Sequence, residues 1–139
     1  MIRVFNITAF IYGTLLALFI PISLGASFLV AAAGHVRSFE WTDYLVFAYS
    51  IITSIGLFRC RAAFRRDFSI STKLYYLMCL LIMAGMAAAL FPIVEAVFIN
   101  NSMEDLDGPS IGIVALVICI NLILLIGLQA NKPSSKAGA

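Results

Sequence analysis

The sequence predicts an all-α protein, a bundle of four transmembrane helices with both termini in the cytoplasm. Composition gives the first reason: 63% of the 139 residues are hydrophobic, 12% are charged and the mean hydropathy is +1.05, whereas soluble domains carry about 25% charged residues. Four apolar stretches give the second reason, because each can cross a hydrocarbon core of about 30 Å as a helix. The third reason is the distribution of Lys and Arg, which accumulate in cytoplasmic loops.

Length and composition define the four spans. They cover about residues 4–33, 41–58, 74–99 and 111–130. None of them alternates polar and apolar residues, as the strands of a transmembrane barrel do. Residues 1–131 are therefore predicted to form one membrane domain, and the polar segment 132–139 a disordered cytoplasmic tail.

The first span has an alternative interpretation as a cleaved signal peptide. Arg3, a long apolar run and the small residues at 31–34 resemble such a leader and its cleavage site. The apolar run is longer than the roughly 7–15 residues of a usual leader. We therefore expect the first span to stay in the protein.

Two prolines lie inside the spans, Pro21 in the first and Pro92 in the third. Each removes a backbone donor and is predicted to kink or interrupt its helix. The segments around them, residues 13–23 and 85–95, align when proline is placed on proline. This suggests a duplicated helical hairpin with a pseudo-two-fold axis along the membrane normal.

Basic residues determine the predicted orientation. Five lie between the second and third spans, namely Arg59, Arg61, Arg65, Arg66 and Lys73. Three more lie before the first span or after the last, namely Arg3, Lys132 and Lys136. The prediction is a bacterial inner-membrane protein whose five inner basic residues contact anionic lipid headgroups.

The opposite side is acidic. It collects a candidate contact rim or ion-pair site, formed by His35, Arg37, Glu40, Asp43, Glu104, Asp105 and Asp107. Asp43 also suits the start of the second helix, because a carboxylate there interacts favourably with the helix dipole. A metal site built from these residues is chemically conceivable, but their spacing does not select one.

Glu95 is a carboxylate within the third apolar stretch. Its number exceeds that of Lys73 by 22, which corresponds to about 33 Å along a straight helix. Because the hydrocarbon core is about 30 Å thick, Glu95 is predicted to lie at the outer interface.

Asn121 lies halfway along the fourth span, where a buried amide needs a partner. We expect a hydrogen bond to another helix, with Thr14, Ser50, Thr53 or Ser54 as the partner. The alternative is contact with an ion or a substrate. Small residues spaced four apart, such as Gly85 and Ala89, favour close packing between helices.

The rest of the sequence contains no motif that indicates catalysis or cofactor binding. The three cysteines are far apart, there is one histidine, and no phosphate-binding, dinucleotide-binding, zinc-protease or nucleophile motif is present. Cys60 lies between two arginines, which favours its thiolate, and it is close enough to the membrane for acylation; an inert cysteine is the simpler interpretation. We expect no catalysis, no cofactor and no metal, and the net charge of +2 gives no reason to expect nucleic-acid binding.

The predicted function is therefore contact with other proteins in the membrane, as an accessory or assembly subunit or as an immunity-type protein. The partner is another membrane protein or a second copy of the chain. The alternative is a small oligomeric proton- or cation-coupled transporter or channel. That alternative would use Glu95 and Asn121, with Pro92 and Pro21 shaping the helices.

Overall fold

The computed structural model describes residues 2–34, 39–66, 70–95 and 108–132, and these residues form four helices. The helices are α1 (Ile2–Ala32), α2 (Trp41–Arg65), α3 (Thr72–Val94) and α4 (Gly108–Gln129). Each is long and apolar enough to cross a membrane, and the described residues contain no strand. The predicted all-α class with four potential spans is confirmed.

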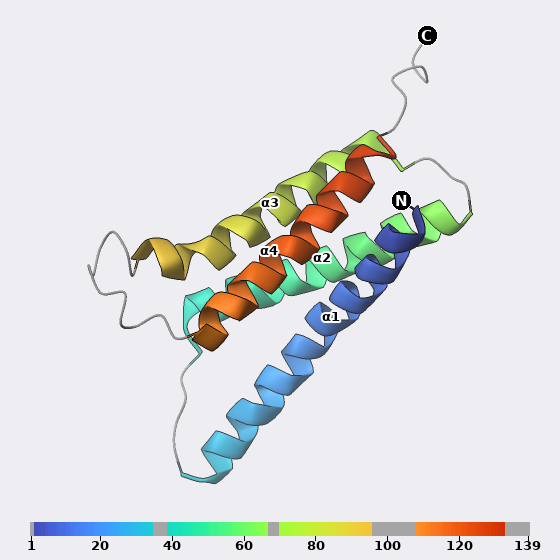
Figure 1. Ribbon diagram of the computed structural model, residues 1–139. Helices are drawn as coiled ribbons and strands as arrows, with labels where there is room; N and C mark the ends of the chain where they lie inside the picture. Colours follow the sequence, from blue (N-terminus) through green and yellow to red (C-terminus); the bar gives the residue numbers. More distant parts are fainter. Residues whose placement is uncertain (1, 35–38, 67–69, 96–107, 133–139) are drawn as a thin grey trace.

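The helices run alternately up and down and form a bundle (Figure 1). α1 packs against α2 and α4, and α3 packs against the same two helices; in the described part of the chain no Cα atoms of α1 and α3, or of α2 and α4, come within 8 Å of each other. One end of the bundle therefore holds the start of α1, the end of α2, the start of α3 and the end of α4. We call it the basic end, because it carries Arg3, Arg61, Arg65 and Lys73.

α2 is longer than the predicted span. It continues past residue 58, so that Arg59, Arg61 and Arg65 lie on the helix. Arg66 is the C-cap residue, and its N–H donates to the Ala63 carbonyl at 3.0 Å. The expectation that these three arginines lie in a loop between the second and third spans is therefore wrong. Arginine and alanine are good helix formers, and positive charge is favourable near a helix C-terminus.

The prolines do not interrupt their helices. α1 continues through Pro21 to Ala32, and α3 continues through position 92 to Val94. Pro21 is exposed, and transmembrane helices tolerate proline where local adjustment satisfies the freed carbonyl groups. The side chain of Pro92 lies outside the described residues, and a bend at either proline stays a prediction.

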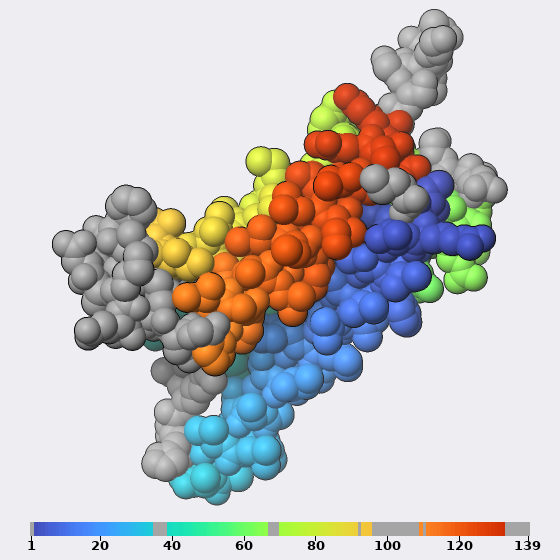
Figure 2. All heavy atoms as spheres, viewed as in Figure 1, coloured from blue at the N-terminus to red at the C-terminus, as the bar shows by residue number. Residues whose placement is uncertain are grey.

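The core gathers in the half of the bundle nearest the basic end. Its apolar members are Phe5, Ala9, Tyr12, Leu57, Cys60, Phe64, Ile70, Tyr75, Met78, Ile82, Leu124 and Leu128. In α1 every buried residue lies between Phe5 and Gly13, apart from Ser27. Figure 2 shows that the last turns of α1 project beyond the other helices. Because the near half of α1 supplies core residues, removal of this helix as a leader would open the bundle.

Glycines permit the closest contacts between helices. A Cβ at Gly56 would collide with Met78, and one at Gly127 would lie 2.6 Å from Phe5 Cδ2. Gly13 and Gly85, which the proposed hairpin duplication aligns, have different neighbours. Gly13 faces Phe58 and Leu57, whereas Gly85 faces the Tyr49 hydroxyl. The pseudo-two-fold relation between the hairpins stays a prediction.

Candidate functional site

A group of polar side chains is enclosed between the helices at mid-bundle. Its members are Tyr12 of α1, Tyr49 and Thr53 of α2, and Asn121 of α4, with Gly85 of α3 beside them. We call these five residues the polar cluster. Thr53 and Asn121 are fully buried, and Tyr12 is 9% exposed.

Asn121 links two helices within the polar cluster. Its Nδ2 donates to the Val117 carbonyl of its own helix at 2.9 Å and to the Tyr12 hydroxyl at 3.5 Å. The expected hydrogen bond to another helix is therefore present, but its partner is Tyr12, which was not among the expected residues. Tyrosines of membrane proteins concentrate at the interfaces, so a tyrosine well inside an apolar span was the available signal.

Tyr49 links α2 to α3. Its hydroxyl donates to the Leu81 carbonyl at 3.2 Å and lies next to Tyr12 and Thr53. Gly85 makes room for this hydroxyl, since a Cβ at position 85 would collide with it and would lie 3.8 Å from Asn121 Oδ1. The polar cluster therefore depends on a glycine in α3.

Two acceptors of the polar cluster have no hydrogen-bond partner among the described residues. They are Asn121 Oδ1 and Thr53 Oγ1, and both are buried. An unsatisfied buried polar atom costs about 1–3 kcal/mol, and polar groups deep in a membrane are expensive to keep. The polar cluster can therefore accept one more donor, such as a water molecule or a ligand hydroxyl.

Ser54, one of the expected partners of Asn121, is used elsewhere. It donates to the Gly13 carbonyl at 2.9 Å and so fastens α2 to α1. Ser50 is also buried. The small and hydroxyl-bearing residues of α2 thus face the other helices.

Glu95 is separate from the polar cluster. It follows the end of α3, where it is exposed, on the side of the bundle away from Lys73. It comes ten residues after Gly85, about 15 Å along a helix. The two residues that the transport alternative combined, Glu95 and Asn121, therefore do not form one site.

A groove between α2 and α3 leads to the polar cluster. Its volume is about 250 Å³, and its walls are Leu45, Val46, Tyr49, Ala84, Gly85 and Ala88. Ala84 and Ala88 are exposed, so the α3 side of the groove is a surface of small residues. Tyr49 belongs to both the groove and the polar cluster.

Most of the candidate acidic rim lies outside the described residues, namely His35, Arg37, Glu104, Asp105 and Asp107. Its two described members start α2. The Glu40 N–H donates to the Asp43 side chain at 3.0 Å, as the N-cap N–H does in a capping box at a helix N-terminus. The Asp43 N–H donates to the Glu40 carbonyl at 3.0 Å. In the described ranges, no three His, Cys, Asp or Glu side chains come together.

At the basic end the arginines differ in their surroundings. Arg59, Arg66 and Lys73 are exposed, whereas Arg61 is half-buried, with its Cζ 4.3 Å from the centre of the Phe10 ring.

Cys60 is completely buried, so the interpretation of this cysteine as an accessible thiolate or acylation site is wrong. Its neighbours in sequence point to other faces of the helix, and the thiol packs in the core.

The described residues thus offer an enclosed polar cluster, a small-residue groove that reaches it and an asymmetric basic end. Hydroxyl and amide groups can bind and orient a hydrogen-bonding group, and small residues admit another helix. No protein-family model, curated protein or solved structure matches the chain.

Proposed function

We propose that this is a bacterial inner-membrane protein without catalytic activity that acts by contact with another transmembrane helix. It serves as an accessory or assembly subunit, or as an immunity-type protein. Its basic end and both termini face the cytoplasm, following the rule for Lys and Arg. The contact surface is the groove between α2 and α3.

The small-residue wall of this groove is the observation that carries the proposal. Ala84 and Ala88 lie four residues apart and are exposed on one face of α3, with Gly85 behind them. Lipid tails are as apolar as leucine, so helices associate in membranes chiefly by close packing, and small residues four apart permit it. Leu45 and Val46 supply the opposite wall, against which the side chains of an incoming helix can pack.

Chemistry in the bundle interior supports a non-catalytic role. The polar cluster consists of two phenols, one hydroxyl, one amide and a glycine. None of these groups is a strong acid or base near neutral pH.

The experiment is site-specific photo-cross-linking in cells at position 88, with position 87 as the matched control. Ala87 is exposed on the same helix but does not line the groove. We expect a protein adduct at position 88 and little at position 87, and mass spectrometry will show whether the adduct is a partner or a second copy. Equal yields at both positions, or lipid adducts alone, would refute the groove as a contact surface.

A substitution that fills the groove provides a second test of this contact surface. Ala88→Leu should abolish the adduct made from a probe at Leu45, whereas Ala87→Leu should leave it unchanged. Both changes are at exposed positions and should leave folding intact, because lipid-facing leucine is well tolerated.

Transport is the second candidate, and the unsatisfied atoms of the polar cluster favour it. Asn121 Oδ1 and Thr53 Oγ1 offer two acceptors deep in the bundle, as a path for a hydrated cation would require. Flux into proteoliposomes tests this idea: Asn121→Leu should abolish it, and Glu95→Gln, which alters an exposed residue outside the polar cluster, should not. Absence of flux in the unaltered protein would exclude this candidate.

A further inference from the structure

We propose that a second groove, between α1 and α2 at the basic end, binds the headgroup of an anionic phospholipid. Its volume is about 290 Å³, and its walls are Arg3, Asn6, Ile7, Phe10, Arg61 and Arg65. We call it the arginine groove. It adds a residue of the first helix, Arg3, to the basic residues that sequence alone assigns to lipid contact.

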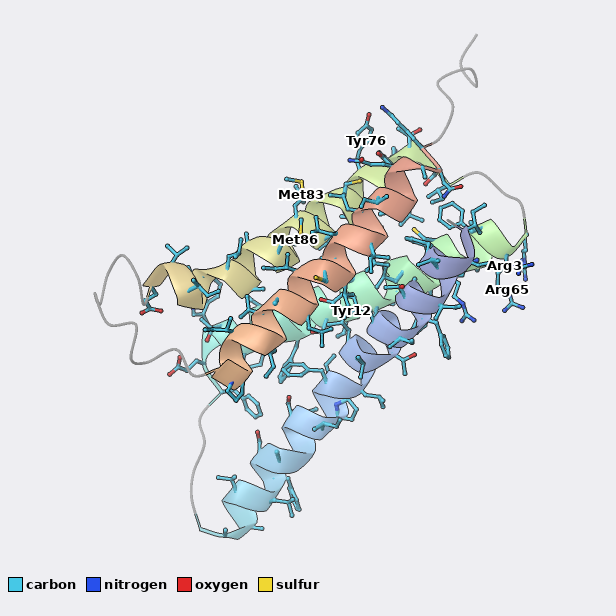
Figure 3. All side chains as sticks on the ribbon, viewed as in Figure 1. Arg3, Tyr12, Arg65, Tyr76, Met83 and Met86 are labelled. Atoms are coloured by element: carbon cyan, nitrogen blue, oxygen red, sulfur yellow. The ribbon has the colours of Figure 1, made fainter. Side chains whose placement is uncertain are left out.

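Three positive charges converge on the arginine groove from two helices. Arg3 lies in the first turn of α1 and Arg65 is the last residue of α2, and Figure 3 shows the two close together at the basic end. No carboxylate is among the lining residues. Guanidinium groups bind phosphate oxygens through paired hydrogen bonds, so an anion in the groove would relieve the mutual repulsion of the arginines.

Arg61 is held in place before any ligand arrives. Its guanidinium lies over the Phe10 ring, with Cζ 4.3 Å from the ring centre, a favourable cation–π geometry. Its Nε is buried and has no hydrogen-bond partner in the described structure. A fixed guanidinium with spare donors loses less conformational entropy on binding than a mobile one.

The remaining polar atom specifies the kind of headgroup. Asn6 Oδ1 is also buried without a partner among the described residues. As an acceptor it would repel a phosphate oxygen, but it matches a free hydroxyl group of an alcohol that is esterified to the phosphate. A phosphodiester that carries a glycerol hydroxyl satisfies both the arginines and Asn6.

The shape of the arginine groove selects a lipid over a free phosphate ion. Its charged members lie at helix ends, where a membrane surface is expected, while Ile7 and Phe10 continue the same wall toward mid-membrane. Ile7 is 61% exposed and Phe10 46%. A ligand with a phosphate at one end and an acyl chain at the other covers both parts.

Binding of phosphatidylglycerol to the purified full-length protein in a neutral detergent tests the proposal. Arg61→Gln should weaken the affinity about 10- to 100-fold, the range of a charge-assisted hydrogen bond. Arg59→Gln is the matched control, because it removes the same charge from an exposed site on the same helix, outside the groove. It should weaken binding by no more than about fivefold, the effect of one surface charge.

A replacement variant, a neutral lipid and inorganic phosphate complete the test. If Arg61→Gln fails to fold, Arg65→Gln replaces it, since Arg65 is exposed and lines the groove. Phosphatidylcholine should bind at least tenfold more weakly than phosphatidylglycerol. Equal losses from Arg59→Gln and the groove variants would show diffuse attraction and overturn the site. Displacement of the lipid by inorganic phosphate at similar concentrations would overturn the choice of a lipid.

Discussion

The close contact between α4 and α1 at Gly127 allows a quantitative prediction. A Cβ at this position would lie 2.6 Å from Phe5 Cδ2, 3.0 Å from Phe5 Cβ and 3.2 Å from Phe5 Cγ. Phe5 is 1% exposed, and its ring lies 5.0 Å from that of Phe64 in an edge-on arrangement. Because the clash involves atoms near the Phe5 backbone and the ring is confined, Phe5 cannot rotate away cheaply.

Gly127→Ala should therefore destabilise the bundle, and Gly112→Ala should not. Overpacking of a core costs about 1–3 kcal/mol, while replacement of a helical glycine by alanine gains about 1 kcal/mol. Gly127→Ala should then lower the stability of the bundle by about 0–2 kcal/mol. At Gly112, on the same helix, nothing lies within 4 Å of an added Cβ, so only the gain remains. The difference between the two variants isolates the overpacking cost, about 1–3 kcal/mol.

Cys60 provides the assay. Its side chain is fully buried, whereas Cys79 is half-buried and Cys119 is exposed. In a protein with Cys79→Ala and Cys119→Ala, a thiol-reactive fluorophore will label Cys60 only when the bundle opens. Labelling is followed as a function of temperature and of denaturing detergent, for both glycine variants.

Equal stability of the two alanine variants would refute the packing of Phe5 against Gly127. A repair variant strengthens the test, since Phe5→Leu removes the ring that causes the clash. Its own cost should be smaller in the Gly127→Ala background than in the unaltered protein, because contacting residues are not additive.

Three further predictions concern polar groups. Ser54→Ala should lower stability by about 0.5–1.5 kcal/mol in the same assay, because it removes the 2.9 Å hydrogen bond to the Gly13 carbonyl. Asn121→Leu should leave stability unchanged or raise it by up to about 2 kcal/mol, since the bond to Tyr12 is worth about 0.6 kcal/mol and the unpaired oxygen costs about 1–3 kcal/mol. Asp43→Ala should lower stability by about 1 kcal/mol, because it removes the acceptor for a backbone N–H at the start of α2.

Controls and contrary outcomes follow from the same contacts. Thr42→Ala, at an exposed position, should stay within about 0.5 kcal/mol of the unaltered protein. An effect of Ser54→Ala no larger than this would argue against the bond to Gly13. A loss above 2 kcal/mol for Asn121→Leu would show that its oxygen is satisfied after all. An unchanged stability for Asp43→Ala would remove the capping role.

Much of the architecture follows from the sequence, because length and apolarity are enough to identify helices that can cross a membrane. Composition identified four such helices. Counting from Lys73 placed Glu95 at the opposite end of the third span, and in the structure Glu95 follows the end of α3. The ends of the helices were harder to predict from the sequence. Charged residues end an apolar span but not a helix, so Arg59, Arg61 and Arg65 were assigned to a loop although α2 includes them.

The polar contacts were only partly predictable. Asn121 was recognisable because an amide in lipid needs a partner, but depth alone pointed to Thr14 and the hydroxyls of α2 and missed Tyr12. The partner depends on rotation of α1 about its axis, which turns Tyr12 inward beside Ala9 and Phe5. In the same way, Arg3 and Arg61 share a groove because the first turns of α1 pack against the last turns of α2.

The helical class, the number of potential spans and the difference in charge between the two ends can all be read from the amino-acid sequence. The inward face of each helix becomes known only from the packed fold, and with it the polar cluster, the groove between α2 and α3 and the arginine groove. The physical reason is the solvent. In water an apolar stripe marks the buried face of a helix, but in lipid the buried and exposed faces are equally apolar. Orientation is then set by where glycine, hydroxyl and amide groups fit together, and that is a property of the packed bundle.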